Sequence, residues 1–535
     1  MVVSQHGICA TSHPLASEAG ARILREGGSA ADAAIAANAV LGVVEPMMNG
    51  IGGDLFVLYR EAKTGRLTGL NASGPAPRAL SPQALTRIGM TRMPAAGIHS
   101  VTVPGAVDGW SKMHSRFGRL PWRRLLEPAI AYAEEGFPVS EIVAALWSVQ
   151  ETLMKLDFNP AAARVFLPRE GYPPREGDLF RNPGLALSYS LLAAEGPAAF
   201  YAGPIADAIL RTSESLFGAL TAEDLSTYSA EWVDPISIDY RGWRVYELPP
   251  NSQGLAVLEI LNIMEQFPVT APSVESAAAE LHKRIEAMKL AYADAWRYNA
   301  DPRTASIPLD GLLSKEYART RAALIDPARA NPAAEPGTPP AFPNTSDTVY
   351  LAVVDREGNI ASWIQSIYAS FGSAIVPDGM GFALQNRGAA FSLDPAHPNV
   401  LAGGKRPYHT IIPGFMERDR AHVGFGIMGG VNQPLAHAQF ISNVADYNMN
   451  LQKALEAPRF FRGNPAGCDV SIEARVPAAV LNALAQMGHQ ITLRPEYSQE
   501  MGRGQAVLHN SETGINFAAS DPRADGAATP EGIPC

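Results

Sequence analysis

A proline-rich stretch that runs directly into a β-hairpin places the strongest constraint on how this chain folds. The hairpin is predicted over 348–372, because Val349, Leu351 and Val353 alternate with other residues and 355–359 supplies turn residues before a second apolar run. Prolines at 332, 336, 339, 340 and 343 precede it and disfavour both a helix and a central strand. An exposed, irregular linker is therefore expected to lead straight into a strand that begins with Thr348.

A threonine in this position suits a self-cleaving hydrolase with an N-terminal nucleophile. The Thr348 hydroxyl can attack the carbonyl of Asp347, shift the acyl group from nitrogen to oxygen, and leave Thr348 as a new N-terminus after hydrolysis. The freed amine then acts as the base for the hydroxyl of the same residue, without a histidine. The alternative is an ordinary strand threonine, a residue type common in sheets. The hairpin pattern alone leaves both interpretations open.

Composition limits the classes of function. The chain has 535 residues, of which 47% are hydrophobic and 18% charged, enough for a substantial core in one or several domains. A net charge of -10 argues against nucleic-acid binding. The start of the chain shows no signal peptide, and the apolar run 30–48 is interrupted by polar residues, so we expect a cytoplasmic protein without a membrane span.

Cysteine and histidine spacing gives no indication of a metal centre or a disulfide framework. The cysteines are scattered at Cys9, Cys468 and Cys535, and the histidines lack the spacing of known zinc motifs. No phosphate-binding loop and no GxSxG sequence is present either. We therefore expect neither a metal nor a cofactor.

The remaining pattern alternates helices and strands. Helices are predicted over 13–26, 30–45, 285–298, 435–447 and 478–487, and short strands over 56–60, 67–71, 373–384 and 423–427. Gly429 and Gly430 fall between a predicted strand and a predicted helix. Adjacent small residues there can aim backbone N–H groups at one point, as an oxyanion hole requires, although a plain turn has the same sequence.

Several longer motifs carry a resemblance to a known family. They are GGSAADAAIAANAV, VPGAVDGW, FYAGPIADAI, LTAEDL, DYRGWRVYELPP, EAMKLAYADAWRY, DTVYLAVVDREGN, GGKRPYHTIIP, MGG and ASDPR. Together they make the chain resemble the γ-glutamyltransferase family (glutathione hydrolases) over about residues 5–525. The resemblance implies an α+β fold of the N-terminal-nucleophile type, with two antiparallel sheets sandwiched between helical layers. It also implies cleavage before Thr348 into a large chain, 1–347, and a small chain, 348–535, which share one composite domain. A homo-oligomer is a further expectation.

The family's catalytic positions match this sequence residue by residue. Thr348 falls on the nucleophile, and Gly429 and Gly430 fall on the oxyanion-hole pair. Ser366 falls on a threonine whose hydroxyl supports the nucleophile, and a serine retains that hydroxyl. The resemblance therefore implies an intact machinery for acyl transfer.

The positions that hold the glutamyl head group in the family differ here. The family's arginine for the α-carboxylate aligns with Ser73, and the acid for the α-amino group aligns with Ala390. A family asparagine aligns with Tyr368, and two serines align with His409 and Thr410. A glutamyl head group would therefore leave its ammonium and carboxylate unpaired in a desolvated pocket, which lowers the free energy gained on binding.

Arg387 suggests a different substrate. A guanidinium can bind a carboxylate through two parallel hydrogen bonds, and His409, Thr410 or Tyr368 can assist. The structural alternative is that Arg387 pairs with a neighbouring carboxylate or is solvated. The departures resemble the acylase-like branch of the family, which includes cephalosporin acylases, glutaryl acylases and oxamate amidohydrolases.

Three functional hypotheses follow. The first is an amidohydrolase that cleaves a small-molecule amide of an oxamate-like or glutaryl-like acid through an acyl-enzyme, with no cofactor and no nucleic-acid or membrane partner. The second is a true γ-glutamyltransferase or glutathione hydrolase, and the third is an unprocessed binding relative. The intact catalytic positions argue against the third.

Overall fold

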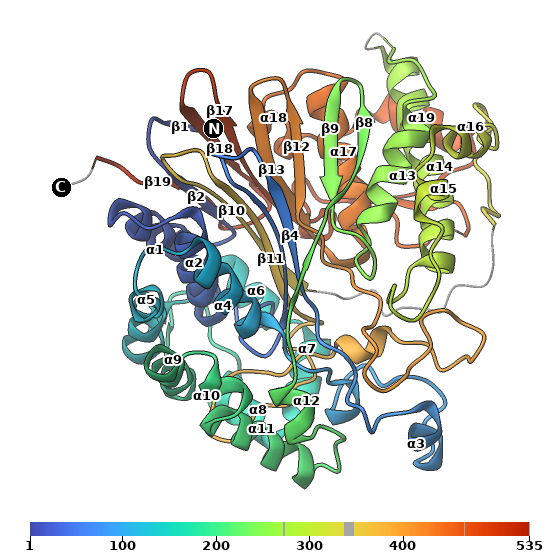
Figure 1. Cartoon of the computed structure of the whole chain (residues 1–535). Helices are drawn as coiled ribbons and strands as arrows, with labels where there is room; N and C mark the ends of the chain where they lie inside the picture. The colour runs from blue at the N-terminus through green and yellow to red at the C-terminus, as the bar shows by residue number, and fades with distance from the viewer. Residues whose placement is uncertain (271–272, 336–346, 465, 534–535) are drawn as a thin grey trace.

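The computed structural model describes residues 1–270, 273–335, 347–464 and 466–533. Most of the predicted proline-rich linker (336–346) and Cys535 lie outside these residues. Within them, two seven-stranded antiparallel sheets stand face to face, and helices cover their outer faces (Figure 1). The predicted α+β sandwich is therefore confirmed.

The first sheet carries the predicted hairpin near its centre. Its strand order is β19 (Ala527–Pro530), β2 (Ile8–Thr11), β10 (Asp347–Val354), β11 (Ile360–Tyr368), β3 (Asp54–Arg60), β4 (Leu67–Ala72) and β7 (Glu231–Val233). The hairpin β10–β11 lies between β2 and β3, which come from the beginning of the sequence. Residues on both sides of Thr348 in sequence thus build one sheet.

The second sheet faces the first across a tightly packed interior. Its order is β1 (Val2–Ser4), β18 (Ile515–Ser520), β17 (Arg503–Asn510), β13 (Ala421–Met428), β12 (Gly414–Arg418), β9 (Trp243–Glu247) and β8 (Ile236–Tyr240). Gly426 of β13 lies against the ring of Tyr350 in β10, where an added Cβ atom would come within 2.4 Å of the ring. Glycine at this position lets the sheets approach closely.

Each sheet has its own helical layer and its own hydrophobic core. Over the first sheet lie α1 (Pro14–Arg25), α2 (Ala30–Val44), α4 (Ala106–Phe117), α5 (Trp122–Glu135) and α9 (Pro183–Glu195), which are blue to green in Figure 1. Over the second lie α13 (Gly254–Met264), α14 (Val274–Tyr298), α16 (Lys315–Ala322), α17 (Gln433–Ala445), α18 (Leu451–Glu456) and α19 (Ala478–Gln486). Ser29 caps α2 through a capping box, so the predicted helix start is confirmed.

Shorter elements complete the described chain. The remaining helices are α3 (Pro82–Arg87), α6 (Glu141–Trp147), α7 (Gln150–Asp157), α8 (Pro160–Phe166), α10 (Ala198–Tyr201), α11 (Pro204–Ser215), α12 (Ala222–Ser226) and α15 (Leu309–Leu312). Small sheets form from β14 (Phe460–Phe461), β15 (Asp469–Glu473) and β16 (Gln490–Arg494), and from β5 (Phe137–Pro138) and β6 (Leu179–Phe180).

One strand prediction is wrong. Residues 373–384 form turns and irregular backbone instead of short strands. The segment packs on α9 through backbone contacts: Asn182 Nδ2 donates to the carbonyl of Gly381 over 2.7 Å. Its glycines mark close approaches, because a Cβ atom on Gly381 would lie 2.2 Å from the backbone nitrogen of Leu185.

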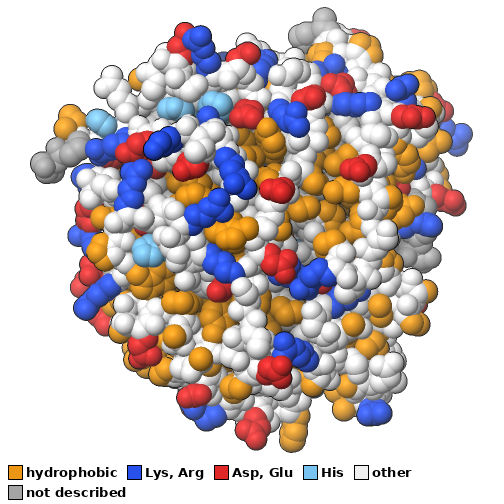
Figure 2. All heavy atoms as spheres, viewed as in Figure 1, with side chains coloured by type: hydrophobic (Ala, Val, Ile, Leu, Met, Phe, Trp, Pro, Cys, Tyr) orange, Lys and Arg blue, Asp and Glu red, His pale blue; other side chains and the backbone are white. Residues whose placement is uncertain are grey.

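The surface carries mixed charge. Figure 2 shows Lys and Arg side chains interspersed with Asp and Glu over the face that is drawn, with apolar side chains between them. None of the helices in the described ranges combines the length and apolar character that a bilayer crossing requires.

Candidate active site

Thr348 lies at an irregularity in the hairpin. The pairing of β10 with β11 shifts register between Asp347 and Val349, so Thr348 stands at a bulge. Bulges change the direction in which a side chain points. The Thr348 side chain is buried, and its Oγ1 donates to Oγ of Ser366 over 3.2 Å.

Ser366 connects the candidate nucleophile to the rest of the site. Its Oγ also accepts a hydrogen bond from the backbone N–H of Tyr368 over 2.8 Å, and Nη2 of Arg387 lies 3.5 Å away. The structure therefore brings Thr348, Ser366 and Arg387 together, while their roles stay predictions.

Arg387 is fully buried at the start of a 3₁₀ turn, Arg387–Ala390. Its Nη1 donates to Oγ1 of Thr410 over 2.8 Å, and its guanidinium carbon lies 4.1 Å from the centroid of the Tyr368 ring. Burial lowers the pKa of Arg387 to about 10, so the group remains a cation at neutral pH. Among the described residues its Nε has no hydrogen-bond partner. A buried guanidinium with unused donors is suited to an anionic ligand.

Tyr368 has an unusual backbone conformation at the end of β11. Its φ of 78° lies in the left-handed region, which is rare for a residue with an aromatic side chain. Such residues concentrate at functional sites, because the surrounding structure must stabilise them. Here the conformation accompanies the stacking of the ring on Arg387.

Positions that carry charged groups in the resembled family are uncharged and buried here. Oγ of Ser73 accepts from Nδ2 of Asn251 over 3.0 Å, and the Ser73 carbonyl accepts from Nε of Arg406 over 3.0 Å. Ala390 is fully buried behind Arg387 in the 3₁₀ turn. The side chains at these two positions therefore offer no ionic partner for an amino-acid head group.

Asp54 is a buried acid that sequence reasoning missed. It begins β3 directly after Gly52 and Gly53, and it pairs with Ser366 across the sheet. Its Oδ2 accepts from Nε2 of His409 over 3.0 Å. Burial raises the pKa of Asp54 to about 7, against the lowering effect of the Arg387 charge. The sequence did contain a sign of this residue: Asp54 is an acid at the start of a mostly apolar strand, directly after a glycine-rich loop.

His409 contacts Asp54 through one ring nitrogen and the backbone through the other. Its Nδ1 accepts from the N–H of Ile411 over 3.3 Å, so Nε2 carries the proton that is donated to Asp54. In the uncut chain both nitrogens are thus engaged within the protein. Donation from His409 to a substrate stays a prediction.

Gly429 and Gly430 form the turn between β13 and α17, as predicted. Their φ angles are 153° and 61°, which side chains rarely permit. Nε2 of Gln253 donates to the Gly430 carbonyl over 2.8 Å and also to the Thr410 carbonyl. This glutamine therefore links the glycine turn to the residue that binds Arg387.

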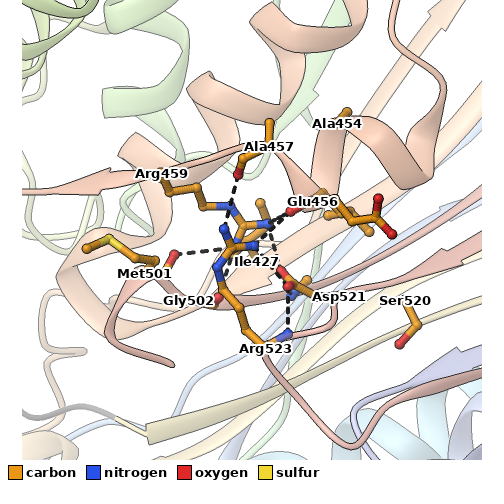
Figure 3. Close-up of polar contacts among 12 residues, drawn as sticks. Ile427, Ala454, Glu456, Ala457, Arg459, Met501, Gly502, Ser520, Asp521 and Arg523 are labelled. Atoms are coloured by element: carbon orange, nitrogen blue, oxygen red, sulfur yellow. Dashed lines mark hydrogen bonds and ion pairs between the residues drawn. The ribbon is translucent and has the colours of Figure 1, made fainter. Parts of the chain in front are cut away.

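A buried ion-pair network supports the glycine turn from behind (Figure 3). Nη1 of Arg459 donates to the Gly502 carbonyl over 2.8 Å, and its Nη2 pairs with Oδ2 of Asp521 at 2.7 Å. Arg523 pairs with the same aspartate at 3.1 Å. A Cβ atom on Gly429 would lie 3.2 Å from Cα of Gly502, so the network fixes the backbone against which the turn packs.

A cluster with metal-binding side chains lies elsewhere, between α14 and the turn that precedes β16. Ligand atoms of His282, Glu286 and His489 fall within 4.8 Å of one another. Nδ1 of His282 hydrogen bonds to Nε2 of His489 at 2.8 Å, and Glu286 pairs with the ammonium of Lys289 at 2.6 Å. These contacts favour a structural role, because the nearby ammonium opposes a cation. Spacing could not reveal the group, since 207 residues separate its histidines.

Comparison with known proteins assigns the family. The sequence matches the Gamma-glutamyltranspeptidase family over residues 16–531. The chain belongs to this family. The sequence resemblance described above is thus confirmed.

Individual relatives cover almost the whole chain. The glutathione hydrolase-like YwrD proenzyme of Bacillus subtilis is 36% identical over 98% of this chain and 99% of its own length. The oxamate amidohydrolase proenzyme of Klebsiella pneumoniae is 35% identical over 98% of both chains. The crystal structure of a cephalosporin acylase from Bacillus halodurans superposes with a TM-score of 0.92 at 42% identity, covering 99% of this chain and 96% of that one. The family member described here is accordingly an enzyme of the N-terminal-nucleophile amidohydrolase class.

Proposed function

We propose that this family member cleaves itself before Thr348 and then hydrolyses an amide of a small carboxylic acid, oxamate-like or glutaryl-like. The observation that carries the proposal is the hydrogen-bonded path from Thr348 through Ser366 to Arg387. The Arg387 cation thus contacts Ser366, which in turn contacts Thr348. An acyl group that ends in a carboxylate can then bind Arg387 while its amide carbonyl meets Thr348.

Self-cleavage begins with the uncut peptide bond between Asp347 and Thr348. The Thr348 hydroxyl, oriented by Ser366, attacks the carbonyl of Asp347, and the resulting ester is hydrolysed. The products are chains 1–347 and 348–535, which remain interleaved in both sheets. The relatives named as proenzymes support such processing.

Catalysis uses the new N-terminus. The α-amine of Thr348 takes the proton of its own hydroxyl, which attacks the substrate amide. Backbone N–H groups at the Gly429–Gly430 turn stabilise the oxyanion, the amine product leaves, and water hydrolyses the acyl-enzyme. Ser366 holds the hydroxyl in place, and Arg387 with Thr410 and Tyr368 binds the distal carboxylate.

A release assay on the purified protein tests the proposal. Intact mass first determines whether the chain is cut before Thr348, with Thr348→Ala as the uncut control. The mature enzyme then receives a glutaryl anilide, oxamate and a γ-glutamyl anilide side by side. Release from the glutaryl compound or oxamate, with little from the γ-glutamyl compound, is expected. Preference for the γ-glutamyl compound would instead identify a glutathione hydrolase.

Arg387 variants test the binding assignment separately. Arg387→Ala should mature normally but lose about 100-fold or more in kcat/KM on the acid amide, because it removes charge-assisted hydrogen bonds. Arg387→Lys should recover part of the loss, since an ammonium keeps the charge without the planar pair of donors. An unchanged kcat/KM in Arg387→Ala would refute the role of this residue.

A further inference from the structure

Asp54 is an acid with no assigned role at the centre of the site. Its carboxylate is fully buried and accepts three hydrogen bonds from neutral donors: the N–H of Gly74 at 3.0 Å, Nε2 of Gln385 at 2.9 Å and Nε2 of His409 at 3.0 Å. Hydrogen bonds of this kind stabilise a carboxylate, but they do not cancel its charge. A buried negative charge also needs a nearby cation.

The positive charge of Arg387 provides that compensation. Arg387 lies 3.5 Å from Oγ of Ser366, the residue that pairs with Asp54 across the sheet. Its other partner, Thr410, follows His409, which binds Asp54. At this position the charge of Arg387 favours the ionised carboxylate through space. The same guanidinium is the group that we assign to the substrate's carboxylate, so this step rests on the proposed function. Two buried carboxylates would then compete for one guanidinium, and like charges in a shared site cannot both stay ionised at low cost.

The other titratable groups around Asp54 remain uncharged or already cationic at neutral pH. Burial, together with the charges of Arg387 and Arg406, holds the pKa of His409 well below its usual range. Burial holds the pKa values of Tyr201 and Tyr228 well above theirs, and raises the pKa of Tyr368. Asp54 is therefore the group that can take up a proton.

We propose that Asp54 is the resident counter-ion of Arg387, and that an anionic acyl group enters the pocket together with one proton, which Asp54 binds. The charge then balances. Before binding, the pocket holds the Asp54 carboxylate and the Arg387 cation. After binding, it holds a neutral Asp54 carboxyl group, the Arg387 cation and the substrate's carboxylate.

Gln385 gives the new proton an acceptor. Among the described residues its Oε1 is buried without a hydrogen-bond partner, while its Nε2 donates to Asp54 and, over 3.2 Å, to the Val103 carbonyl. Rotation of the amide gives up the Val103 contact and brings Oε1 to the carboxyl group, which then donates to it. His409 keeps its tautomer, because its Nδ1 still accepts from Ile411.

The pH dependence of anion binding tests this assignment. The probe is butyrate, a monoanion without an amide, measured as a competitive inhibitor of glutaryl anilide release by the mature enzyme. Because burial raises the pKa of Asp54 to about 7, the inhibition constant should be flat below pH 7 and rise about tenfold per pH unit above it. Asp54→Asn should abolish this rise.

Two controls separate Asp54 from other groups. The Thr348 amine is present in the wild type and in Asp54→Asn. Any pH dependence of the inhibition constant that remains in Asp54→Asn therefore belongs to the amine. Asp355→Asn removes another buried acid with a raised pKa, at the turn between β10 and β11, and should leave the rise intact. Equal slopes in the wild type and Asp54→Asn would overturn the proposal.

A direct measurement covers the case in which Asp54→Asn fails to mature. Calorimetry of butyrate binding to the wild-type enzyme, in buffers of different ionisation enthalpy, gives the number of protons taken up for each butyrate bound. About one proton per butyrate is expected at pH 8 and about 0.1 at pH 6. Binding without proton uptake at pH 8 refutes the role of Asp54 but keeps the proposed function. Absence of butyrate binding at any pH, together with no release from either the glutaryl anilide or oxamate, refutes the proposed function itself.

Discussion

Oγ1 of Thr348 donates to Oγ of Ser366 over 3.2 Å, from one strand of the central hairpin to the next. The register of the hairpin shifts at this point, so that Thr348 faces two residues of β11, Ser366 and Ile367. The contact is present in the single chain, so under the proposed function the same serine would act both in self-cleavage and in catalysis.

Ser366 variants should alter the rate of self-cleavage. Ser366→Ala removes the acceptor of the Thr348 hydroxyl, and we expect cleavage to slow about tenfold. Ser366→Thr retains the hydroxyl and should cleave at close to the wild-type rate. The measurement is a time course of chain separation on a denaturing gel. Equal rates for all three proteins would show that Ser366 is a passive neighbour.

The glycine turn should tolerate no side chain. Gly430→Ala places a methyl group at φ 61° and disturbs the backbone N–H groups, so kcat should fall by about 10²–10³-fold. Gly65→Ala is the matched control, because Gly65 has φ 71° but faces open space in the turn between β3 and β4. It should carry similar backbone strain and keep full kcat. A comparable loss of kcat in both variants would show that the effect comes from general destabilisation.

The ring of Tyr368 should contribute to substrate binding through Arg387. Tyr368→Leu removes the aromatic face under the guanidinium, worth about 2 kcal/mol in a desolvated site. KM for the acid amide should therefore rise up to about 30-fold with little change in kcat. Tyr368→Phe keeps the face and should resemble the wild type. A KM that rises equally in both variants would point to the hydroxyl group instead.

The network behind the glycine turn should matter for stability. Arg459→Met leaves Asp521 with less compensation in the interior, and we expect a loss of about 3 kcal/mol in the free energy of unfolding. The measurement is urea denaturation of the uncut Thr348→Ala chain. Arg420→Met, which breaks the exposed pair with Glu512, should cost no more than about 0.5 kcal/mol. Similar losses would argue that the buried pair has no special role.

Sequence patterns predicted the scaffold better than the contacts within the candidate site. Local periodicity and capping defined the hairpin, the helix after Ser29 and the glycine turn before α17, because each depends on neighbours in sequence. The strands predicted within 373–384 were wrong, since that segment is shaped by contacts with α9 that are distant in sequence.

The pocket depends on contacts that no local pattern contains. Asp54 meets His409, 355 residues later, and Gln385, 331 residues later. Gln253 joins the Thr410 and Gly430 carbonyls in a similar way. The departures at Ser73 and Ala390 were visible in the sequence, but the acid that binds His409 was hidden in a buried strand.

The strand order of the first sheet has a consequence for refolding. β10 lies between β2 and β11, and β19 pairs with the other edge of β2, so strands from before and after Thr348 are interleaved. A cut before Thr348 separates none of these pairs, and the two polypeptides hold together as they did in one chain. Once unfolded, however, they must find each other again by diffusion. The proposed cleavage would thus turn a folding reaction that is independent of concentration into a bimolecular one, and the mature enzyme would depend on a fold that was established before the cut.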